Sequence, residues 1–325
     1  MPRVDVHAHL AGVGTGGSGC WVAPRFRRRW SFLLLRRLVG LRGDEPDADA
    51  RYAARLAALV RAAGLDAAVA LGFDAVVRPD GTEDPARTAL VVPPAWVFAM
   101  AARHPELVPG PSIHPYRRDA LARLDEAIDR GAVLIKWLPA TQGMDPADAR
   151  LAPFYRRLAD AGVALLVHVG GKEHVLPELE PQLHDPERLR RPLEHGVIVV
   201  AAHSGAPAWP VDPDRTDALR RLLRAYPNLW LDNSGLATPS RARHLLRFAR
   251  DDEIAARTLY GSDYPVPSWP LLAWRRLGRR ALTLQRDPNP VRRDLALKRA
   301  LGYPPATETR AAVVLPALAR ALTGR

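Results

Sequence analysis

The sequence is poor in cysteine and in long hydrophobic runs. Its 325 residues contain one cysteine, Cys20, which excludes a disulfide framework and a cysteine-based structural zinc site and fits a reducing compartment. No apolar run approaches the roughly 18 residues that a membrane-spanning helix needs. The N-terminus lacks the charged segment followed by an apolar one that marks a secretory signal. We therefore expect a cytoplasmic protein without a transmembrane segment.

Lysine is also scarce, since only three of the 47 basic residues are lysines. Arginine is abundant enough that the formal net charge is +12 against 35 acidic residues. Much of the excess lies in residues 25–42, with seven arginines and no acid, and in residues 275–299, with nine cations and two acids. Neither segment contains a recognisable nucleic-acid-binding module. We interpret both as solvated basic surfaces and expect no specific nucleic-acid partner.

The segment FRRRWSFLLLRRL, residues 26–38, has the composition of a basic amphipathic helix. We expect its leucine-rich face to pack on the protein's own domain. Two alternatives stay open, in which the helix lies on a membrane surface or binds a partner. The same hydrophobic face is a candidate interface for a homodimer.

Eight short β-rich segments alternate with longer amphipathic segments along the chain. The predicted strands are residues 3–10, 66–73, 107–115, 132–139, 163–170, 197–205, 229–235 and 258–265. Helical patterns include residues 50–64, 118–131, 149–162 and 216–228, several of which end at glycine. Eight such units in turn favour an α/β fold of the (β/α)8 TIM-like barrel type over a doubly wound open sheet.

We expect residues 1–325 to form a single barrel domain with two inserted loops. Residues 11–49 and 74–93 interrupt the barrel pattern after the first and second strands. Because the loops that follow barrel strands build the active-site face, both insertions should lie over the site as lids or partner surfaces. Residues 266–325 should add two or three helices as a C-terminal extension.

Chemically distinctive side chains fall at the ends of four predicted strands. His7 and His9 have the two-residue spacing that places both side chains on one side of a strand. His168, His203 and Asp263 end the fifth, sixth and eighth strands. Burying so many titratable groups at one end of the barrel would cost folding free energy if they had no partner. A bound divalent cation removes that cost. Imidazole and carboxylate ligands suit zinc, manganese, iron or cobalt.

These motifs, from VDVHAHL near the N-terminus to YGSDYP at residues 260–265, resemble those of the amidohydrolase superfamily. More narrowly they are similar to the amidohydrolase-related group, which includes small-acid decarboxylases. The resemblance implies one divalent metal ion, with zinc preferred, and the metal ligands His7, His9, His168 and Asp263. It also implies that Asp263 accepts a proton and that His203 is a second catalytic group. Two departures from the group's pattern, IKWLP and HSG, leave the pocket chemistry open.

Lys136, at the end of the fourth predicted strand, leaves the number of metal ions open. The resemblance implies a single metal ion, whereas in binuclear relatives a carboxylated lysine at this place bridges two. We expect one metal ion and keep a second one, bridged by carboxylated Lys136, as the alternative. The candidate contacts to a small-molecule substrate are Lys136, His114, Trp137 and Asn233, with His174 as a weaker candidate at the same rim.

Two reactions fit these residues. The leading hypothesis is hydrolysis of an amide, ester or lactone bond in a small molecule by a metal-activated water, with Asp263 carrying the proton and His203 stabilising charge. Non-oxidative decarboxylation of a small carboxylic acid uses the same groups and is the alternative. A binding or scaffold protein that acts through its basic surfaces is the third hypothesis.

Overall fold

The computed structural model describes residues 1–40, 45–173, 175–209 and 212–324, and it contains a strand within each of the eight predicted segments. All eight run parallel to their neighbours, in two sheets with the orders β1-β3-β5 and β10-β9-β8-β7-β6. Their bounds are β1 (Val4–His9), β3 (Ala67–Leu71), β5 (Leu107–Gly110), β6 (Leu134–Trp137), β7 (Ala164–Val167), β8 (Val199–Ala201), β9 (Leu229–Asp232) and β10 (Thr258–Leu259).

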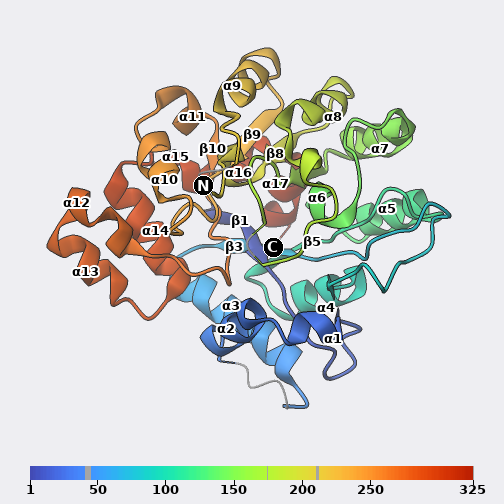
Figure 1. The fold of residues 1–325 in the computed structure, drawn as a ribbon, viewed down its shortest axis with the longest axis horizontal. Helices are drawn as coiled ribbons and strands as arrows, with labels where there is room; N and C mark the ends of the chain where they lie inside the picture. Colours follow the sequence, from blue (N-terminus) through green and yellow to red (C-terminus); the bar gives the residue numbers. More distant parts are fainter. Residues whose placement is uncertain (41–44, 174, 210–211, 325) are drawn as a thin grey trace.

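Backbone hydrogen bonds join the two sheets at both seams. Between β5 and β6, the Lys136 amide donates to the carbonyl of Pro111 at 2.9 Å. Between β1 and the segment that continues β10, the Val6 amide donates to Tyr260 at 2.9 Å, and the His9 amide donates to the Tyr264 carbonyl at 2.7 Å. Eight parallel strands therefore follow one another around a ring, with helices outside it, as expected of a (β/α)8 barrel (Figure 1).

The helices predicted from the sequence are present in the surrounding layer. Among them, α7 ends before Gly162, whose φ of 64° is a left-handed conformation that favours glycine. No helix in the described ranges has both the length and the hydrophobicity needed to cross a bilayer. The α-helices of this layer are α3 (Ala48–Ala62), α4 (Pro94–Arg103), α5 (Ala120–Asp129), α6 (Pro139–Gln142), α7 (Ala152–Ala161), α8 (Arg190–Glu194), α9 (Thr216–Ala225), α10 (Ala242–Phe248) and α11 (Asp252–Ala256). The 3₁₀ turns are η1 (Ala149–Leu151), η2 (Pro181–His184), η3 (Pro186–Leu189), η4 (Ala202–Gly205) and η5 (Pro270–Ala273).

The C-terminal extension contains more helices than the sequence predicts. Residues 267–324, which the structure describes, contain six α-helices instead of two or three, because Gly278, Pro305 and Pro316 divide the helical pattern. They are α12 (Trp274–Leu277), α13 (Arg279–Gln285), α14 (Pro290–Leu301), α15 (Ala306–Thr309), α16 (Ala311–Val314) and α17 (Pro316–Thr323).

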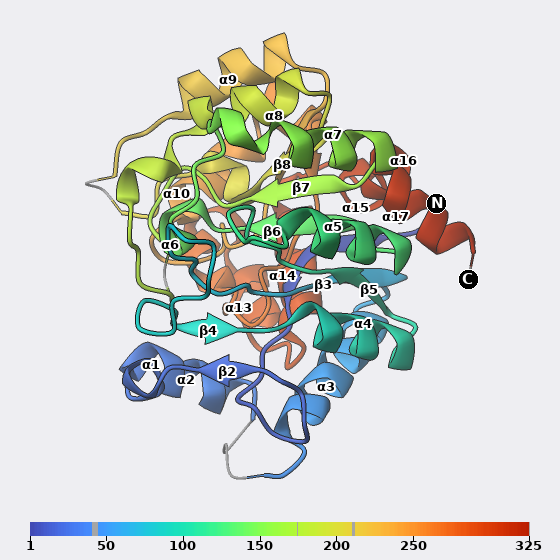
Figure 2. The same cartoon turned by 90° about the vertical axis from the view of Figure 1, so that its right-hand side faces the viewer.

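The end of the barrel where the strands begin is closed by hydrophobic packing. Leu315, between α16 and α17, and Leu318, in α17, pack in one buried cluster with strand residues such as Val6, Val69 and Leu134. Figure 2 shows both chain termini on this side, while the arrow of β7 points away from it. The carboxyl ends of the strands therefore face the opposite end, where a barrel carries its functional site.

The two insertions pair with each other. Residues 11–49 contain β2 (Trp21–Val22), α1 (Pro24–Arg27) and α2 (Trp30–Leu38), and residues 74–93 contain β4 (Leu90–Val91). β2 and β4 pair antiparallel, and Figure 2 shows them beside α1 and α2. This pairing anchors the first insertion to the second.

Candidate metal centre

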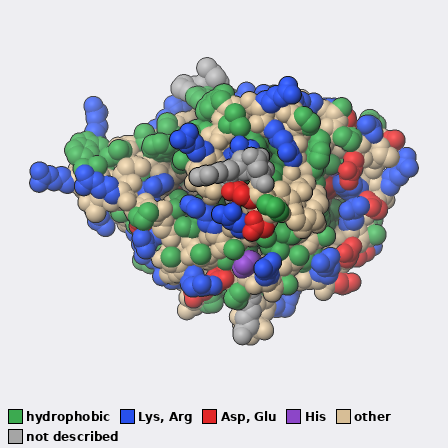
Figure 3. Space-filling view, turned by 90° about the horizontal axis from the view of Figure 1, so that it is seen from below, with side chains coloured by type: hydrophobic (Ala, Val, Ile, Leu, Met, Phe, Trp, Pro, Cys, Tyr) green, Lys and Arg blue, Asp and Glu red, His purple; other side chains and the backbone are tan. Residues whose placement is uncertain are grey.

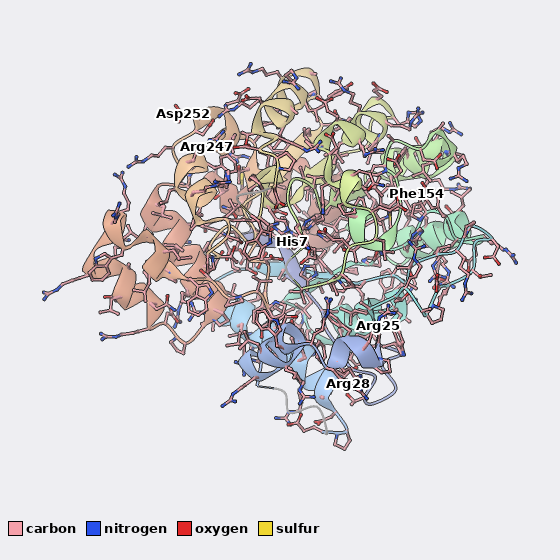
Figure 4. All side chains as sticks on the ribbon, viewed as in Figure 1. His7, Arg25, Arg28, Phe154, Arg247 and Asp252 are labelled. Carbon is pink, nitrogen blue, oxygen red and sulfur yellow. The ribbon has the colours of Figure 1, made fainter. Side chains whose placement is uncertain are left out.

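Three ligand atoms from β1 and from the segment after β10 converge near the centre of the barrel, where Figure 4 labels His7. The Nε2 atoms of His7 and His9 are 3.2 Å apart, and Asp263 Oδ1 lies 3.4 Å from the first and 3.3 Å from the second. A tetrahedral ion bound at about 2.0–2.1 Å has ligand-to-ligand edges of about 3.3–3.4 Å. The triangle therefore has the size and donor set that fit a divalent metal ion.

Neighbouring groups turn the Nε2 atoms of both histidines towards this triangle. His7 Nδ1 is 2.8 Å from Asp232 Oδ2, so the ring donates there and its Nε2 lone pair stays available. The His9 ring stacks on Phe73, with ring centroids 4.7 Å apart, and its buried Nδ1 has no hydrogen-bond partner among the described residues. Burial and the Lys136 charge lower the pKa of His7, and they lower the pKa of His9 to about 3. Both rings are therefore neutral, as a metal ligand must be.

Asp263 is held by the backbone of β1. Its amide donates to the His7 carbonyl at 2.8 Å. Burial raises the pKa of Asp263 to about 6, although the His7 ring opposes the rise. A carboxyl group with a pKa near neutrality can both accept and return a proton, which is the property that a general base and acid needs.

Backbone strain is concentrated at this end of the barrel. His203, Ser204 and Asp263 have φ values of 55°, 50° and 63°, and they are the non-glycine residues with positive φ in the described part of the chain. L-residues adopt this left-handed region at a cost, and such strain clusters at functional sites. The strained backbone of the turns after β8 and β10 therefore lowers local stability, and it sets the directions of the side chains in these turns, which include His203 and Asp263.

A second group of ligand atoms lies beside the first. His168 Nδ1 is 3.2 Å from His203 Nε2 and 3.1 Å from Glu173 Oε2. The other ring nitrogens face backbone carbonyls, His168 Nε2 at Gly171 (2.8 Å) and His203 Nδ1 at Ser234 (2.9 Å). Burial lowers the pKa of both rings, so each is neutral and its one proton is donated to a carbonyl. Three acceptors then converge, an arrangement that a cation stabilises.

Lys136 lies next to both groups. Its Nζ atom is 3.2 Å from His7 Nε2, and burial lowers the pKa of Lys136 to about 8. The His203 ring lies 5.2 Å from the His7 ring and 4.8 Å from the His168 ring, measured between centroids. The two groups and the lysine therefore form one continuous polar floor.

A pocket of about 850 Å³, including its open mouth, lies over this floor at His9, Asp263 and Glu173. Residues 11–49 contribute Phe26, Phe32, Leu35, Arg36 and Val39 to its walls, and residues 74–93 contribute Leu90. Both insertions thus lie over the metal centre, as their place after the first two strands predicts.

The orientation of α2 differs from the sequence-based expectation. Trp30, Leu33, Leu34 and Leu38 are exposed, so the prediction that the leucine-rich face packs on the domain is wrong for these residues. Apolar residues occupy both faces of α2, and only the face with Phe32 turns inward. Figure 3, seen from the side of α1 and α2, shows hydrophobic side chains interspersed with basic ones.

Comparison with known proteins identifies the family. A family model described as amidohydrolase matches residues 4–296, from the first residue of β1 into α14. The chain belongs to the amidohydrolase family. No curated protein sequence matches it.

Solved structures share the TIM-barrel fold of this amidohydrolase over nearly its whole length. An uncharacterized TIM-barrel protein from Bordetella bronchiseptica is 21% identical, with a TM-score of 0.63 over 100% of both chains. An amidohydrolase from Burkholderia multivorans, with bound HEPES, is 19% identical, with a TM-score of 0.54 over 96% of this chain and 99% of that one. A dihydroxybenzoic acid decarboxylase from Polaromonas sp. JS666, with bound manganese and 2-nitroresorcinol, is 14% identical, with a TM-score of 0.54 over 97% of each chain.

All four predicted substrate contacts lie outside the pocket lining of this amidohydrolase, and Lys136 instead lies 3.2 Å from His7 Nε2. His114 Nε2 donates to the Gln142 carbonyl at 3.0 Å, and its Nδ1 accepts from the Tyr116 amide at 3.2 Å. Trp137 is buried against the helix layer beside Phe154, and its indole donates to a backbone carbonyl. The Asn233 side chain accepts from the amide of Gly261. Substrate contacts by His114, Trp137 and Asn233 stay a prediction; each side chain has a hydrogen-bond partner in the protein, and the buried Asn233 Nδ2 atom has none among the described residues. His174 lies outside the described residues.

Asp232 and Glu173 are site residues that the sequence reasoning missed. Asp232 is fully buried and accepts hydrogen bonds from the His7 ring and, at 2.9 Å, from the His203 amide. Burial alone would raise the pKa of Asp232, but these hydrogen bonds hold it below the usual range. The sequence does carry a signal, since Asp232 ends an apolar strand just as Asp263 follows one. Glu173 lies in the loop after β7, where strand-end position carries no information.

Proposed function

We propose that this amidohydrolase is a metal-dependent hydrolase of amide, ester or lactone bonds in small molecules. The observation that carries the proposal is the triangle of His7, His9 and Asp263 at the floor of a pocket. The geometry supports one metal position and one proton carrier next to a space that admits a substrate. These are the parts that metal-assisted hydrolysis requires.

His7, His9 and Asp263 would hold the ion, and we propose His168 from the adjoining group as a further ligand. Zinc suits this nitrogen-rich set, and manganese, iron and cobalt accept the same ligands. When bound, the cation supplies Lewis acidity, which polarises a carbonyl and lowers the pKa of water. Asp232 fixes the His7 tautomer from behind, at 2.8 Å from Nδ1.

Asp263 is the proposed proton carrier. With a pKa of about 6 it is mostly ionised at neutral pH, so it can take a proton from the attacking water and return it to the leaving group. His203 donates its Nδ1 proton to the Ser234 carbonyl at 2.9 Å, which leaves Nε2 as an acceptor. We propose that this nitrogen orients the attacking water.

Decarboxylation of a small carboxylic acid remains the second candidate. It would use the same metal position, and Asp263 in its protonated form would deliver a proton to carbon. The observation in its favour is Arg36, a cation on the pocket wall that could pair with a substrate carboxylate.

Elemental analysis of protein purified without chelator tests the metal centre. We expect about one metal ion per chain, lost in the His7→Ala/His9→Ala variant and retained in His104→Ala, a control at the end of α4. About two ions per chain would instead indicate that the His168, Glu173 and His203 group binds a second ion beside Lys136. Failure to bind metal under several loading conditions would contradict the proposal.

The reaction is tested separately with the metal-loaded protein. A panel of esters and lactones is followed by proton release and a panel of amides by release of the amine, and a panel of aromatic and aliphatic acids is followed by release of carbon dioxide. We expect turnover only in the first panel, dependent on Asp263. Turnover confined to the acids would establish the decarboxylase instead.

A further inference from the structure

The pocket over the metal centre is polar at its floor and apolar on its walls. The floor carries His9, Asp263 and Glu173. The walls above it are mostly hydrocarbon and include the side chains of Phe26, Phe32, Leu35, Val39, Leu138 and Leu176. A substrate that reaches the metal must therefore pass and contact these apolar side chains, and burying its own apolar surface there would favour binding.

The inner face of α2 forms one side of this wall. Phe32, Leu35, Arg36 and Val39 line the pocket, and their spacing of three, four and seven residues places them on one helix face. No residue within α2 is fully buried, although Phe32 contacts Phe26 with ring centroids 5.4 Å apart. Phe32 and Val39 also pack on a buried hydrophobic cluster that includes Phe26, so this face is held against the domain while it borders the hollow of the pocket.

The distribution of charge opposes a small anionic substrate. Arg36 is the one cation among the described residues that line the pocket, and Lys136 lies beneath the floor, 3.2 Å from His7 Nε2. Glu173 and Asp263 place two carboxyl groups at the floor itself. A substrate carboxylate bound along the walls would lose hydration against hydrocarbon, which costs free energy unless a partner is present. One arginine at the helix surface provides at most one such partner.

We propose that the pocket takes an uncharged carbonyl compound with an extended apolar group, and that the inner face of α2 selects for that group. This inference rests on the proposed hydrolase function, because it identifies the substrate class of the same site. The reacting carbonyl lies over the triangle of His7, His9 and Asp263. The apolar group lies against Phe32, Leu35 and Val39.

Binding of unreactive ketones tests the substrate class without any turnover. We would measure the dissociation constants of 2-butanone, 2-hexanone and 2-decanone, with decanoate as the charged partner of the longest ketone. Each added methylene is expected to tighten binding by about threefold until the pocket is filled. Decanoate is expected to bind more weakly than 2-decanone. Affinity that is independent of ketone length, or a preference for decanoate, would overturn the proposal.

Two variants test whether the inner face of α2 selects for the apolar group of the ligand. Phe32→Ser and Leu35→Ser are expected to weaken 2-decanone at least about tenfold and to leave 2-butanone unchanged within about twofold. Leu34→Ser, on the exposed face of the same helix, is the matched control and should change neither. Equal effects of the inner and outer substitutions would contradict a selecting role for the inner face. The length series on the unchanged protein does not depend on how the variants fold.

Turnover separates this inference from the proposed function. If 2-decanone binds as expected but no ester, lactone or amide is hydrolysed, the substrate class stands and the reaction is wrong. If hydrolysis occurs but is fastest for short or anionic esters, the reaction stands and the inference is wrong. We expect hydrolysis to rise with the length of a neutral acyl group, tested with 4-nitrophenyl acetate, hexanoate and hemisuccinate.

Discussion

His7 and His114 occur at comparable places in the barrel but have different surroundings. Both side chains are buried, one on β1 and the other after β5, and burial lowers the pKa of each. One nitrogen of His7 pairs with the Asp232 carboxylate, and the other faces His9 and Asp263. Both nitrogens of His114 are satisfied by backbone groups. The same residue type at a strand end is therefore a proposed metal ligand in one case and a residue held by backbone hydrogen bonds in the other.

The difference extends to the charges around each ring. On the β5 side, Asp74 accepts from Arg117 Nε at 2.8 Å and from the His114 amide at 2.7 Å, so the charges are paired within the protein. On the β1 side, imidazole and carboxyl acceptors accumulate, and Lys136 is the cation closest to His7 among the interactions described. An excess of buried acceptors, more than strand-end position alone, distinguishes the half of the barrel that we propose to bind a cation.

Asp263→Asn should produce the largest effect on the β1 side. The amide can still act as an oxygen ligand but cannot carry a proton, so kcat should fall about 10³-fold, equivalent to about 4 kcal/mol, while metal content is retained. Steady-state kinetics on the metal-loaded variant, beside elemental analysis, measure this. Loss of the metal in parallel with kcat would show that Asp263 is chiefly a ligand, and an unchanged kcat would remove it from proton transfer.

His114→Gln should affect stability and its dependence on pH. The folded pKa of about 4 lies below the ordinary value of 6.5, so between these values the unfolded chain binds a proton that the folded protein does not. Stability therefore falls as pH is lowered through this window, by up to about 3 kcal/mol from this ring. The variant should flatten that slope in urea unfolding from pH 7.5 to 4.5.

Metal content is the control measurement for His114→Gln, because His7 faces the metal group and His114 does not. Metal content of His114→Gln should equal that of the unchanged protein, because neither ring nitrogen of His114 faces the metal group. A lowered metal content with an unchanged pH slope would show instead that His114 belongs to the metal half.

Asp232→Asn should have an intermediate effect, on metal affinity. The carboxylate holds the His7 ring through Nδ1, and loss of such a partner typically weakens metal binding about 10–100-fold. Competition with a fluorescent chelator measures the affinity, with the exposed Asp217→Asn as control. An unchanged affinity in a folded Asp232→Asn protein would mean that the carboxylate serves the backbone turns after β8 and β9 alone.

The sequence predicts the barrel because apolar strands repeat eight times along the chain. It also predicts that His7, His9 and Asp263 come together, since the pleat of β1 places both histidines on one side and Asp263 lies in the turn after β10. Their role as metal ligands stays a prediction. The sequence does not predict Asp232 and Glu173 as site residues, because their role depends on which strands and loops meet across the barrel. The sequence does not predict the orientation of α2 for a related reason. A helix with apolar residues on both sides does not reveal which side packs on the domain.

Trp137→Phe should have the smallest effect of the four substitutions. It tests whether two adjacent residues of β6 differ in role, since Lys136 lies beside His7 and Trp137 packs beside Phe154 in the helix layer. The indole donates to the Ile113 carbonyl at 2.8 Å, so its loss should cost about 1 kcal/mol of unfolding free energy, while kcat and KM stay within about twofold. The exposed Trp274→Phe should change neither. A tenfold rise in KM with unchanged stability would place the indole against substrate and restore the prediction made from the sequence. A stability loss without a kinetic change would show that two adjacent residues of one strand serve the site and the helix layer separately.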